Sequence, residues 1–243
     1  MATFAENPVI AHRGAWKANK LPENSIASLK EAIRLGCTGS EFDIWMTADD
    51  SLVINHDPHY NKISIEKAGY AELLQFKLSN GEKIPTLREY ILAGLENNSN
   101  SMLVFEIKPS TINVERGRRI ADKVVALVKE LNAVSMAAYI SFDYEILKQI
   151  LIADPNAKTQ YLKGEIAPAQ LKKDGMDGLD YHFSIFKKHP EWIAEAKLHS
   201  LRLNAWTVND AKEMENLLDS GFHYITTNEP ELLFEILNRR KNK

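Results

Sequence analysis

Short hydrophobic runs alternate with longer amphipathic segments along almost the whole chain. The first run covers residues 9–12, and residues 25–35 then carry apolar side chains three and four positions apart. A short apolar run is typical of a buried strand, whereas a spacing of three and four is typical of a helix that buries one face. Because the two patterns keep recurring, the sequence predicts repeated strand–helix units.

Eight main strands are expected, each followed by a helix. The expected strands are 9–12, 39–44, 102–107, 138–141, 158–162, 178–181, 202–206 and 224–226. The expected helices are 25–35, 86–95, 113–131, 144–153, 168–173, 190–197, 210–220 and 229–238. Repeated units of this kind favour a parallel sheet, and eight of them in 243 residues favour an α/β fold of the (β/α)8 TIM barrel type. An open doubly wound sheet is the alternative, although no Gly-x-Gly-x-x-Gly motif follows any expected strand.

One long stretch interrupts this alternation. Residues 52–55 form a short returning strand, and residues 56–85 then show no regular pattern before the next helix. Loops that follow the strands of a barrel surround its active site. We therefore expect one catalytic barrel domain over residues 1–243, with a short insertion after the second strand at 56–85 that acts as a lid.

The composition is that of an ordinary globular protein, with 44% hydrophobic residues, 26% charged residues and a net charge of −3. This balance gives no reason to expect nucleic-acid binding, and no run is long enough for a membrane-spanning helix. Because no signal peptide is evident, a soluble cytoplasmic protein is expected, unless a periplasmic or secreted form lost its leader before numbering. Cys37 is the single cysteine and is expected to be a buried thiol. The oligomeric state stays open.

Three acidic residues lie at or near the ends of two strands. Glu41 and Asp43 are two positions apart, so their side chains share one face of a strand, and Glu106 lies near the end of the next main strand. If the strands are neighbours, the carboxylates converge, and a pair about 4 Å apart repels by roughly 4 kcal/mol. A bound cation relieves this repulsion, and oxygen ligands favour one Mg²⁺ or Ca²⁺ ion over zinc. The alternative is three solvated or salt-bridged acids.

Two histidines adjoin these acids in the expected barrel. His12 and His56 each follow a hydrophobic run, and imidazole titrates near neutral pH, so one can accept a proton while the other donates one. The alternative for an isolated histidine is a hydrogen-bonded core group. Asp57 either orients His56 or caps a turn.

Further residues are candidates for substrate binding. Arg13 and Lys108 offer positive charge to phosphoryl oxygens, or form ion pairs with Glu23 and the acids. Asn24 lies at the start of the first helix, where it either donates to a phosphate or caps the helix, and Ser25 is the other candidate for the N-cap. Trp206 ends the seventh strand and is either an apolar wall of the substrate pocket or a core residue.

With these residues placed, the chain resembles the glycerophosphodiester phosphodiesterase family over nearly its whole length. The matching motifs are, in order, His12-Arg13-Gly14, Pro22-Glu23-Asn24-Ser25, Glu41-Phe42-Asp43, His56-Asp57, Ile84-Pro85-Thr86-Leu87, Glu106-Ile107-Lys108, Ala205-Trp206-Thr207-Val208-Asn209 and Thr226-Thr227-Asn228-Glu229-Pro230. His-Arg-Gly alone is a weak signal, but the ordered set is highly specific.

The resemblance implies a (β/α)8 barrel with a small insertion after the second strand, a divalent cation and a histidine pair. The positions that match are Glu41, Asp43 and Glu106 for the cation, His12 and His56 for proton transfer, and Arg13 and Lys108 for phosphate. Two departures stand out. Asn228 replaces an aspartate found in many members, and residues 58–60 lack the Leu and Arg often seen there.

The sequence therefore predicts a metal-dependent phosphodiesterase that hydrolyses glycerophosphodiesters to sn-glycerol 3-phosphate and an alcohol. A related barrel phosphoesterase that acts on lysophospholipids or inositol phosphodiesters is one alternative. A non-catalytic module that binds glycerophosphodiesters is the other. The alcohol, the choice between Mg²⁺ and Ca²⁺, the histidine that acts as base, and the attacking oxygen (water or a glycerol hydroxyl) stay open.

Overall fold

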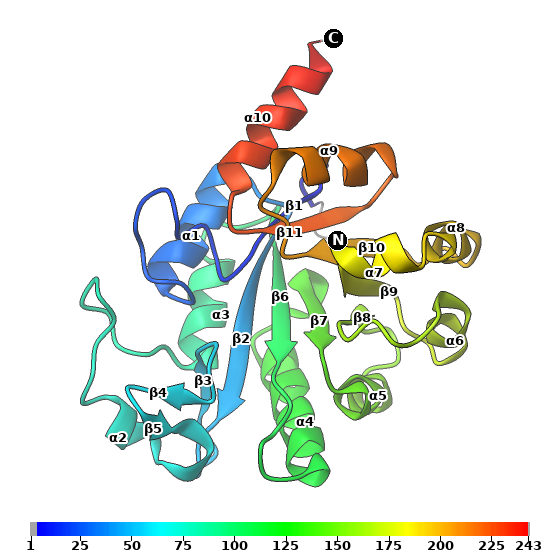
Figure 1. Cartoon of the computed structure of the whole chain (residues 1–243). Coiled ribbons are helices and arrows are strands. Elements are labelled where there is room, and N and C mark those ends of the chain that lie inside the picture. The colour runs from blue at the N-terminus through cyan, green and yellow to red at the C-terminus, as the bar shows by residue number, and fades with distance from the viewer. Residues whose placement is uncertain (1–3, 243) are drawn as a thin grey trace.

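Eight parallel strands close into a barrel with helices on its outside (Figure 1). The computed structural model describes residues 4–242. The strands follow the order β1-β2-β6-β7-β8-β9-β10-β11 around the barrel, and the last one pairs with the first. The predicted (β/α)8 TIM barrel is confirmed, and the open doubly wound alternative is wrong.

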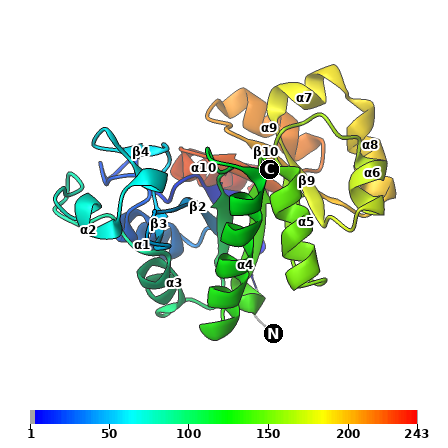
Figure 2. The ribbon, with the colours of Figure 1, turned by 90° about the horizontal axis from the view of Figure 1, so that it is seen from below.

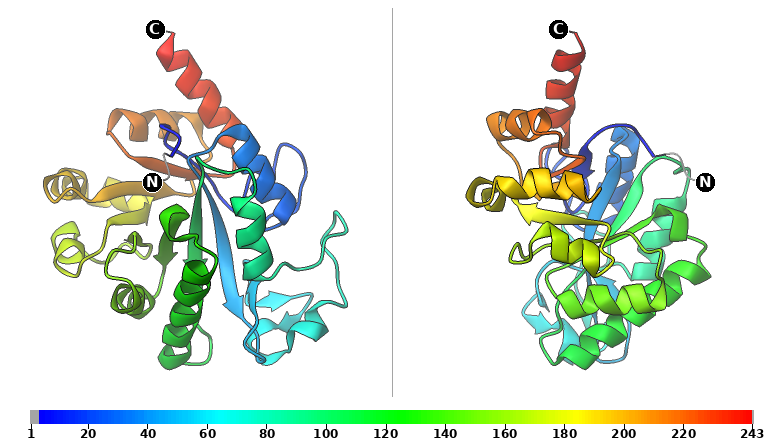
Figure 3. Two further views of the ribbon diagram at one scale, coloured as in Figure 1. Left: turned by 180° about the vertical axis from the view of Figure 1, so that it is seen from behind. Right: turned by 90° about the vertical axis from the view of Figure 1, so that its right-hand side faces the viewer.

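The elements agree closely with the expected ones. The barrel strands are β1 Val9–Ala11, β2 Gly39–Met46, β6 Met102–Ile107, β7 Ala137–Ser141, β8 Thr159–Tyr161, β9 Gly178–His182, β10 Arg202–Trp206 and β11 Tyr224–Thr227. The outer helices are α1 Ile26–Leu35, α3 Leu87–Leu95, α4 Val114–Glu130, α5 Tyr144–Ala153, α6 Pro168–Lys173, α7 Phe183–Lys188, α8 Glu191–Leu198, α9 Ala211–Asp219 and α10 Pro230–Lys241. A 3₁₀ turn, η2 Val134–Met136, precedes β7. Helix α10 packs on α9 and β1, and its end projects from the body (Figure 3).

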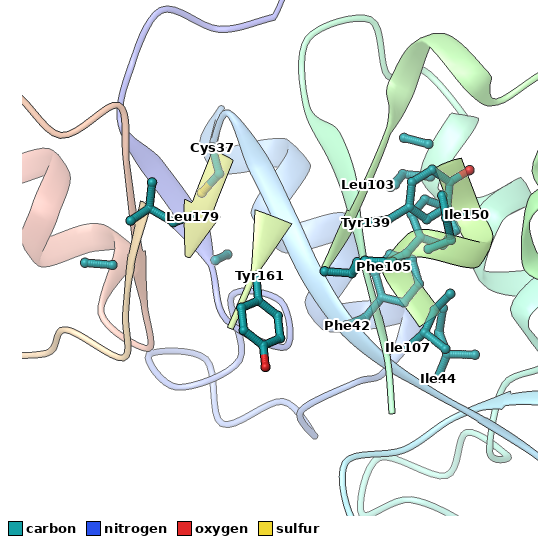
Figure 4. Close-up of a cluster of buried hydrophobic side chains, with 14 of the residues drawn as sticks. Cys37, Phe42, Ile44, Leu103, Phe105, Ile107, Tyr139, Ile150, Tyr161 and Leu179 are labelled. Carbon is teal, nitrogen blue, oxygen red and sulfur yellow. The ribbon is translucent and has the colours of Figure 1, made fainter. Parts of the chain in front are cut away.

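Side chains alternate between the inside and the outside of the barrel wall, as expected for strands. The outward residues pack against the helices, where the Phe42 and Phe105 rings lie 4.8 Å apart and Tyr139 lies 5.4 Å from Phe105 (Figure 4). Ile10 and Val104 belong to the apolar cluster that fills the interior, so the barrel is a packed core with its site at one end. Cys37 is buried, as expected.

The segment between β2 and α3 forms a small unit beside the carboxyl end of β2. It contains β3 Leu52–Ile54, which pairs antiparallel with β2, and then β4 His59–Tyr60, β5 Ile63–Ser64, η1 Ile65–Lys67 and α2 Tyr70–Leu73. These elements enclose a hydrophobic core of their own, made of Trp45, Val53, Tyr60, Ile65, Ala68, Leu73 and Ile84. Figure 2 shows this unit and helices α6–α8 on opposite sides of the molecule. Its function as a lid stays a prediction.

Six of the described elements escape the sequence pattern. Helix α7 has six residues, and α2, β4, β5, η1 and η2 are shorter still. Fewer than two helical turns cannot show a period of 3.6, and two residues cannot show alternation. Strand β1 also ends one residue earlier than expected, so His12 lies in the turn that follows.

Candidate active site

A pocket opens at the carboxyl ends of the barrel strands. It has an empty volume of about 470 Å³ and is lined by His12, Arg13, Glu41, His56, Glu106, Lys108, Ile140, Phe142, Leu162, Asp180, Trp206, Thr207 and Thr226. Seven of the nine site residues predicted from the sequence are in this lining. The other two, Asp43 and Asn24, are buried side chains that contact it from behind. The structure therefore brings all nine candidates to one place.

The three acids converge because β2 and β6 are neighbours. Asp43 and Glu106 are register partners across the two strands, and Glu41 shares the inward face with Asp43. One carboxylate oxygen from each of the three lies within 4.8 Å of the others. All three side chains are buried, with exposures of 1% for Glu41, 0% for Asp43 and 6% for Glu106. Their oxygens could therefore hold one cation.

Burial and mutual repulsion perturb the protonation of this cluster. Burial, followed by the charges of Asp43 and Glu106, raises the pKa of Glu41 well above its usual range. Burial and the Asp43 charge raise the pKa of Glu106 to about 7. Within residues 4–242, Oε1 of Glu41 has no hydrogen-bond partner. Within the described residues Glu41 forms no ion pair with a lysine or arginine, and a bound cation would supply positive charge beside it.

Asp43 differs from the other two acids because it has cationic neighbours. Burial alone would raise its pKa, but Lys108 and Arg13 outweigh that effect and lower it. The Lys108 ammonium lies 2.6 Å from Oδ1 of Asp43 and 2.5 Å from Oε1 of Glu106. Burial works against the charge of Lys108, yet Asp43 and Glu106 raise its pKa overall. Lys108 is therefore held as a cation between two strands.

The turn after β1 places Arg13 between two sets of carboxylates. Its backbone N–H donates to Oε2 of Glu41 at 2.8 Å, and its NH1 group donates to both oxygens of Glu23 at 2.9 and 3.0 Å. Its Nε atom lies 3.5 Å from Asp43. The ion pairs expected as the alternative role of Arg13 and Lys108 are thus formed, and their contact with phosphate stays a prediction.

Gly14 lets this turn lie against helix α1. Its φ of +83° favours glycine, and a Cβ at this position would lie 2.5 Å from Oγ of Ser28. The close approach is to the helix, and it fixes the backbone that presents His12 and Arg13.

Asn24 corrects one of the sequence expectations. Of the two expected candidates for the N-cap of α1, Ser25 is confirmed, because it accepts from the backbone N–H of Ser28 at 3.0 Å, and the capping role of Asn24 is wrong. The Asn24 amide instead donates to Oδ2 of Asp43 at 2.7 Å and accepts from the Asp43 backbone N–H at 3.2 Å. Asn24 therefore orients an acid, and the expected phosphate contact stays a prediction.

Closure of the barrel brings together His12 and Asn228. Ala11 and Thr227 are register partners on β1 and β11, so the residues that follow them meet. His12 Nδ1 lies 2.7 Å from Oδ1 of Asn228 and donates to it, which leaves Nε2 with its lone pair, 3.9 Å from Oε2 of Glu41. Burial and the nearby Arg13 charge lower the pKa of His12 to about 4, so this imidazole is neutral near pH 7.

His56 follows β3, where the insertion begins, and its side chain is more exposed than that of His12. Its Nδ1 atom lies 2.8 Å from Oδ1 of Asp57, in agreement with the orienting role considered for that aspartate. The backbone carbonyl of His56 accepts from the Trp45 indole at 3.1 Å, which fixes the main chain of the rim. The two histidines therefore face one pocket from different elements.

An aromatic wall completes the pocket on the side of β9 and β10. Trp206 lines the pocket, and its ring meets Phe142 edge-on at 5.4 Å. Its indole N–H donates to the backbone carbonyl of Asp180 at 2.9 Å. Asp180 is a pocket residue that the sequence analysis missed, although a carboxylate inside an otherwise apolar strand was a signal for it.

Within residues 4–242, no helix is long and apolar enough to cross a membrane.

The barrel and its pocket define a (β/α)8 enzyme with acid and histidine groups at the carboxyl ends of its strands. Residues 12–232 match the model of the glycerophosphoryl diester phosphodiesterase family, and the chain belongs to that family. The resemblance inferred from the motifs is thereby confirmed, and the protein is a phosphoric diester hydrolase.

Individual relatives agree with this assignment. A glycerophosphodiester phosphodiesterase of Caldanaerobacter subterraneus subsp. tengcongensis is 29% identical, over 95% of this chain and 98% of its own. A crystal structure of such an enzyme from Parabacteroides distasonis has a TM-score of 0.93 and 40% identity, covering 98% of this chain and 99% of that one. A phosphodiesterase of Oleispira antarctica, solved in complex with the product sn-glycerol-3-phosphate, has a TM-score of 0.82 at 23% identity. The match covers 96% of this chain and 97% of that one, and it shows a shared fold.

Proposed function

We propose that the protein hydrolyses glycerophosphodiesters to sn-glycerol 3-phosphate and an alcohol, with one divalent cation held by Glu41, Asp43 and Glu106. The observation that carries this proposal is the convergence of three buried carboxylates in a pocket with two histidines. The family assignment supports the reaction, and the product found in the Oleispira antarctica relative supports the products.

The donor set fits a hard cation. All three candidate ligands are carboxylates, and the buried Oε1 of Glu41 lacks a hydrogen-bond partner within the described residues. Oxygen donors of this kind suit Mg²⁺ or Ca²⁺. When bound, the cation supplies a Lewis acid for a phosphoryl oxygen and relieves the repulsion among the acids.

The histidines divide the proton transfers between them. His12 is neutral near pH 7, and its hydrogen bond to Asn228 leaves Nε2 free to accept a proton from the attacking hydroxyl. His56 is oriented by its hydrogen bond to Asp57, and in this position its ring can protonate the leaving alcohol. Arg13 and Lys108 line the same pocket and offset negative charge that develops on the phosphoryl oxygens.

The direct test is to identify the products of glycerophosphocholine by phosphorus NMR. We expect sn-glycerol 3-phosphate and choline as products. Phosphocholine and glycerol would show that the wrong ester bond was assigned. Lysophosphatidylcholine and glycerophosphoinositol are assayed in parallel.

The parallel substrates distinguish the remaining candidates. Faster turnover of the lysophospholipid or the inositol diester would favour a related phosphoesterase. Binding of every diester without any product, with Mg²⁺ and Ca²⁺ supplied, would favour a binding module.

A further inference from the structure

Asp180 is a buried carboxyl in the pocket that none of the proposed steps uses. It lies on β9, four strands around the barrel from β2, and so faces the acid cluster from the opposite wall. Its exposure is 1%, and it lines the same pocket as the two histidines. Among the residues that the structure describes, 4–242, none forms a hydrogen bond with its Oδ1 atom.

A buried carboxyl oxygen without a partner is costly, and proteins keep few of them. Its register partner on β10 shows the usual solution, because Asn204 accepts a hydrogen bond from the Thr226 hydroxyl at 3.2 Å inside the barrel. The surroundings of Asp180 provide no such donor to Oδ1 within the described chain. The missing donor is therefore expected to come from a molecule in the pocket.

The groups around Asp180 indicate what kind of molecule this is. The Trp206 indole is fixed by its hydrogen bond to the Asp180 carbonyl, and Ile140 and Leu162 add apolar surface to the same lining. A carboxyl beside an aromatic ring and aliphatic side chains suits a short polyol, whose hydroxyls donate hydrogen bonds while its C–H groups contact the apolar surface. The cationic groups that would attract a phosphate, Arg13 and Lys108, lie elsewhere in the lining.

We propose that Asp180 is the specificity-determining residue for the glycerol half of the substrate and accepts a hydrogen bond from a glycerol hydroxyl. This inference rests on the proposed function. Glycerol is the half that all glycerophosphodiesters share, so it suits the buried end of the pocket, where Asp180 is 1% exposed. The alcohol varies from one diester to another and needs the open side.

Two ligands that differ only in their hydroxyls test this role. Calorimetry with Mg²⁺ present measures the binding of sn-glycerol 3-phosphate and of n-propyl phosphate, which has the same chain length and phosphate but no hydroxyl. We expect the unaltered protein to bind glycerol 3-phosphate about 3- to 10-fold more tightly, as for one ordinary hydrogen bond. Asp180→Ala should remove most of this preference and leave the affinity for propyl phosphate within about twofold.

Two further variants separate recognition from folding. Asp180→Asn keeps the size of the side chain and should lose part of the preference. Asp143→Asn makes the same chemical change at the N-cap of α5, outside the pocket lining, and should retain the full preference.

Three outcomes would overturn the inference: no preference in the unaltered protein, an unchanged preference in both Asp180 variants, or an equal loss of affinity for both ligands. The proposed function fails separately, if the unaltered protein hydrolyses no glycerophosphodiester.

Discussion

Glu106 is the acid whose protonation responds most directly to conditions near neutral pH. Its pKa is about 7, because the side chain is buried beside Asp43, and the pKa of Glu41 lies well above its usual range. A cation needs both groups as carboxylates, so binding must displace protons. Glu41 and Glu106 thus link metal affinity to pH, whereas Asp43, whose pKa is lowered, does not.

We expect the affinity for Mg²⁺ to rise between pH 6 and pH 8. Below a pKa of about 7, Glu106 holds a proton that the cation must displace, so affinity falls by about tenfold per pH unit for each proton released. Calorimetry in buffers of different ionisation enthalpy measures the number of protons released. An affinity that does not change with pH, with no proton release, would contradict the charge state described for this cluster.

The two histidines should respond differently to the leaving group. With choline as the leaving group, His12→Ala and His56→Ala should each lose about 10²–10⁴ in kcat. A p-nitrophenyl ester of glycerol phosphate needs little protonation of its leaving oxygen, so His56→Ala should recover most of its rate and His12→Ala should not. Steady-state assays of both esters measure this difference. Recovery by the His12 variant instead would reverse the two roles.

At the scale of elements, the insertion is held to the barrel by two carboxylates. Glu66 of η1 accepts hydrogen bonds from the backbone N–H and hydroxyl of Thr111, the Ser110 hydroxyl and the Arg116 guanidinium. Glu82 accepts from the backbone N–H groups of Ile26 and Ala27, the first residues of α1, where a negative charge is favoured. These contacts tie the insertion to the segment that follows β6 and to the start of α1.

Glu66→Ala should lower the free energy of unfolding by about 2 kcal/mol, because it removes the acceptor of four partly buried hydrogen bonds. Arg116 also donates to the carbonyls of Met46 and Thr47 at the carboxyl end of β2. Because the variant removes the Glu66 partner of Arg116, the carboxyl end of β2 should become less rigid. Chemical denaturation gives the stability, and limited proteolysis shows whether residues 56–85 become accessible. Glu235→Ala, at an exposed position within α10, is the matched control and should change neither. Equal results for the two variants would show that the anchor contributes nothing.

For the whole molecule, closure of the barrel assembles the site from distant parts of the chain. His12 and Asn228 are 216 residues apart and meet because β1 pairs with β11. Glu41 and Asp43 could be predicted as a pair, since alternation along a strand depends on local sequence alone. Their convergence with Glu106 requires that β2 and β6 are neighbours. The sequence predicts this pairing only indirectly, because it follows from the barrel fold and not from any local pattern.

Other features of the site could not be predicted from the sequence. The hydrogen bonds of Asn24 to Asp43 depend on the turn that precedes α1, where Asn24 adopts a φ of +57°. The exposure of Asp180 to the pocket depends on the packing of β9 and β10. Such contacts depend on how side chains from distant segments are oriented toward one another. The local hydrophobic pattern of each segment carries no information about that orientation.

The central claim is that the buried acid cluster needs a divalent cation for hydrolysis, and one measurement tests it most directly. The rate of glycerophosphocholine hydrolysis is measured after complete removal of divalent ions by a chelator, and again after Mg²⁺ or Ca²⁺ is restored. The account predicts that chelation lowers the rate of hydrolysis by at least about 10²-fold and that Mg²⁺, Ca²⁺ or both restore it. This is the effect expected of a Lewis acid that stabilises charge at the reacting phosphate by several kcal/mol. Full turnover by the chelated protein would contradict it.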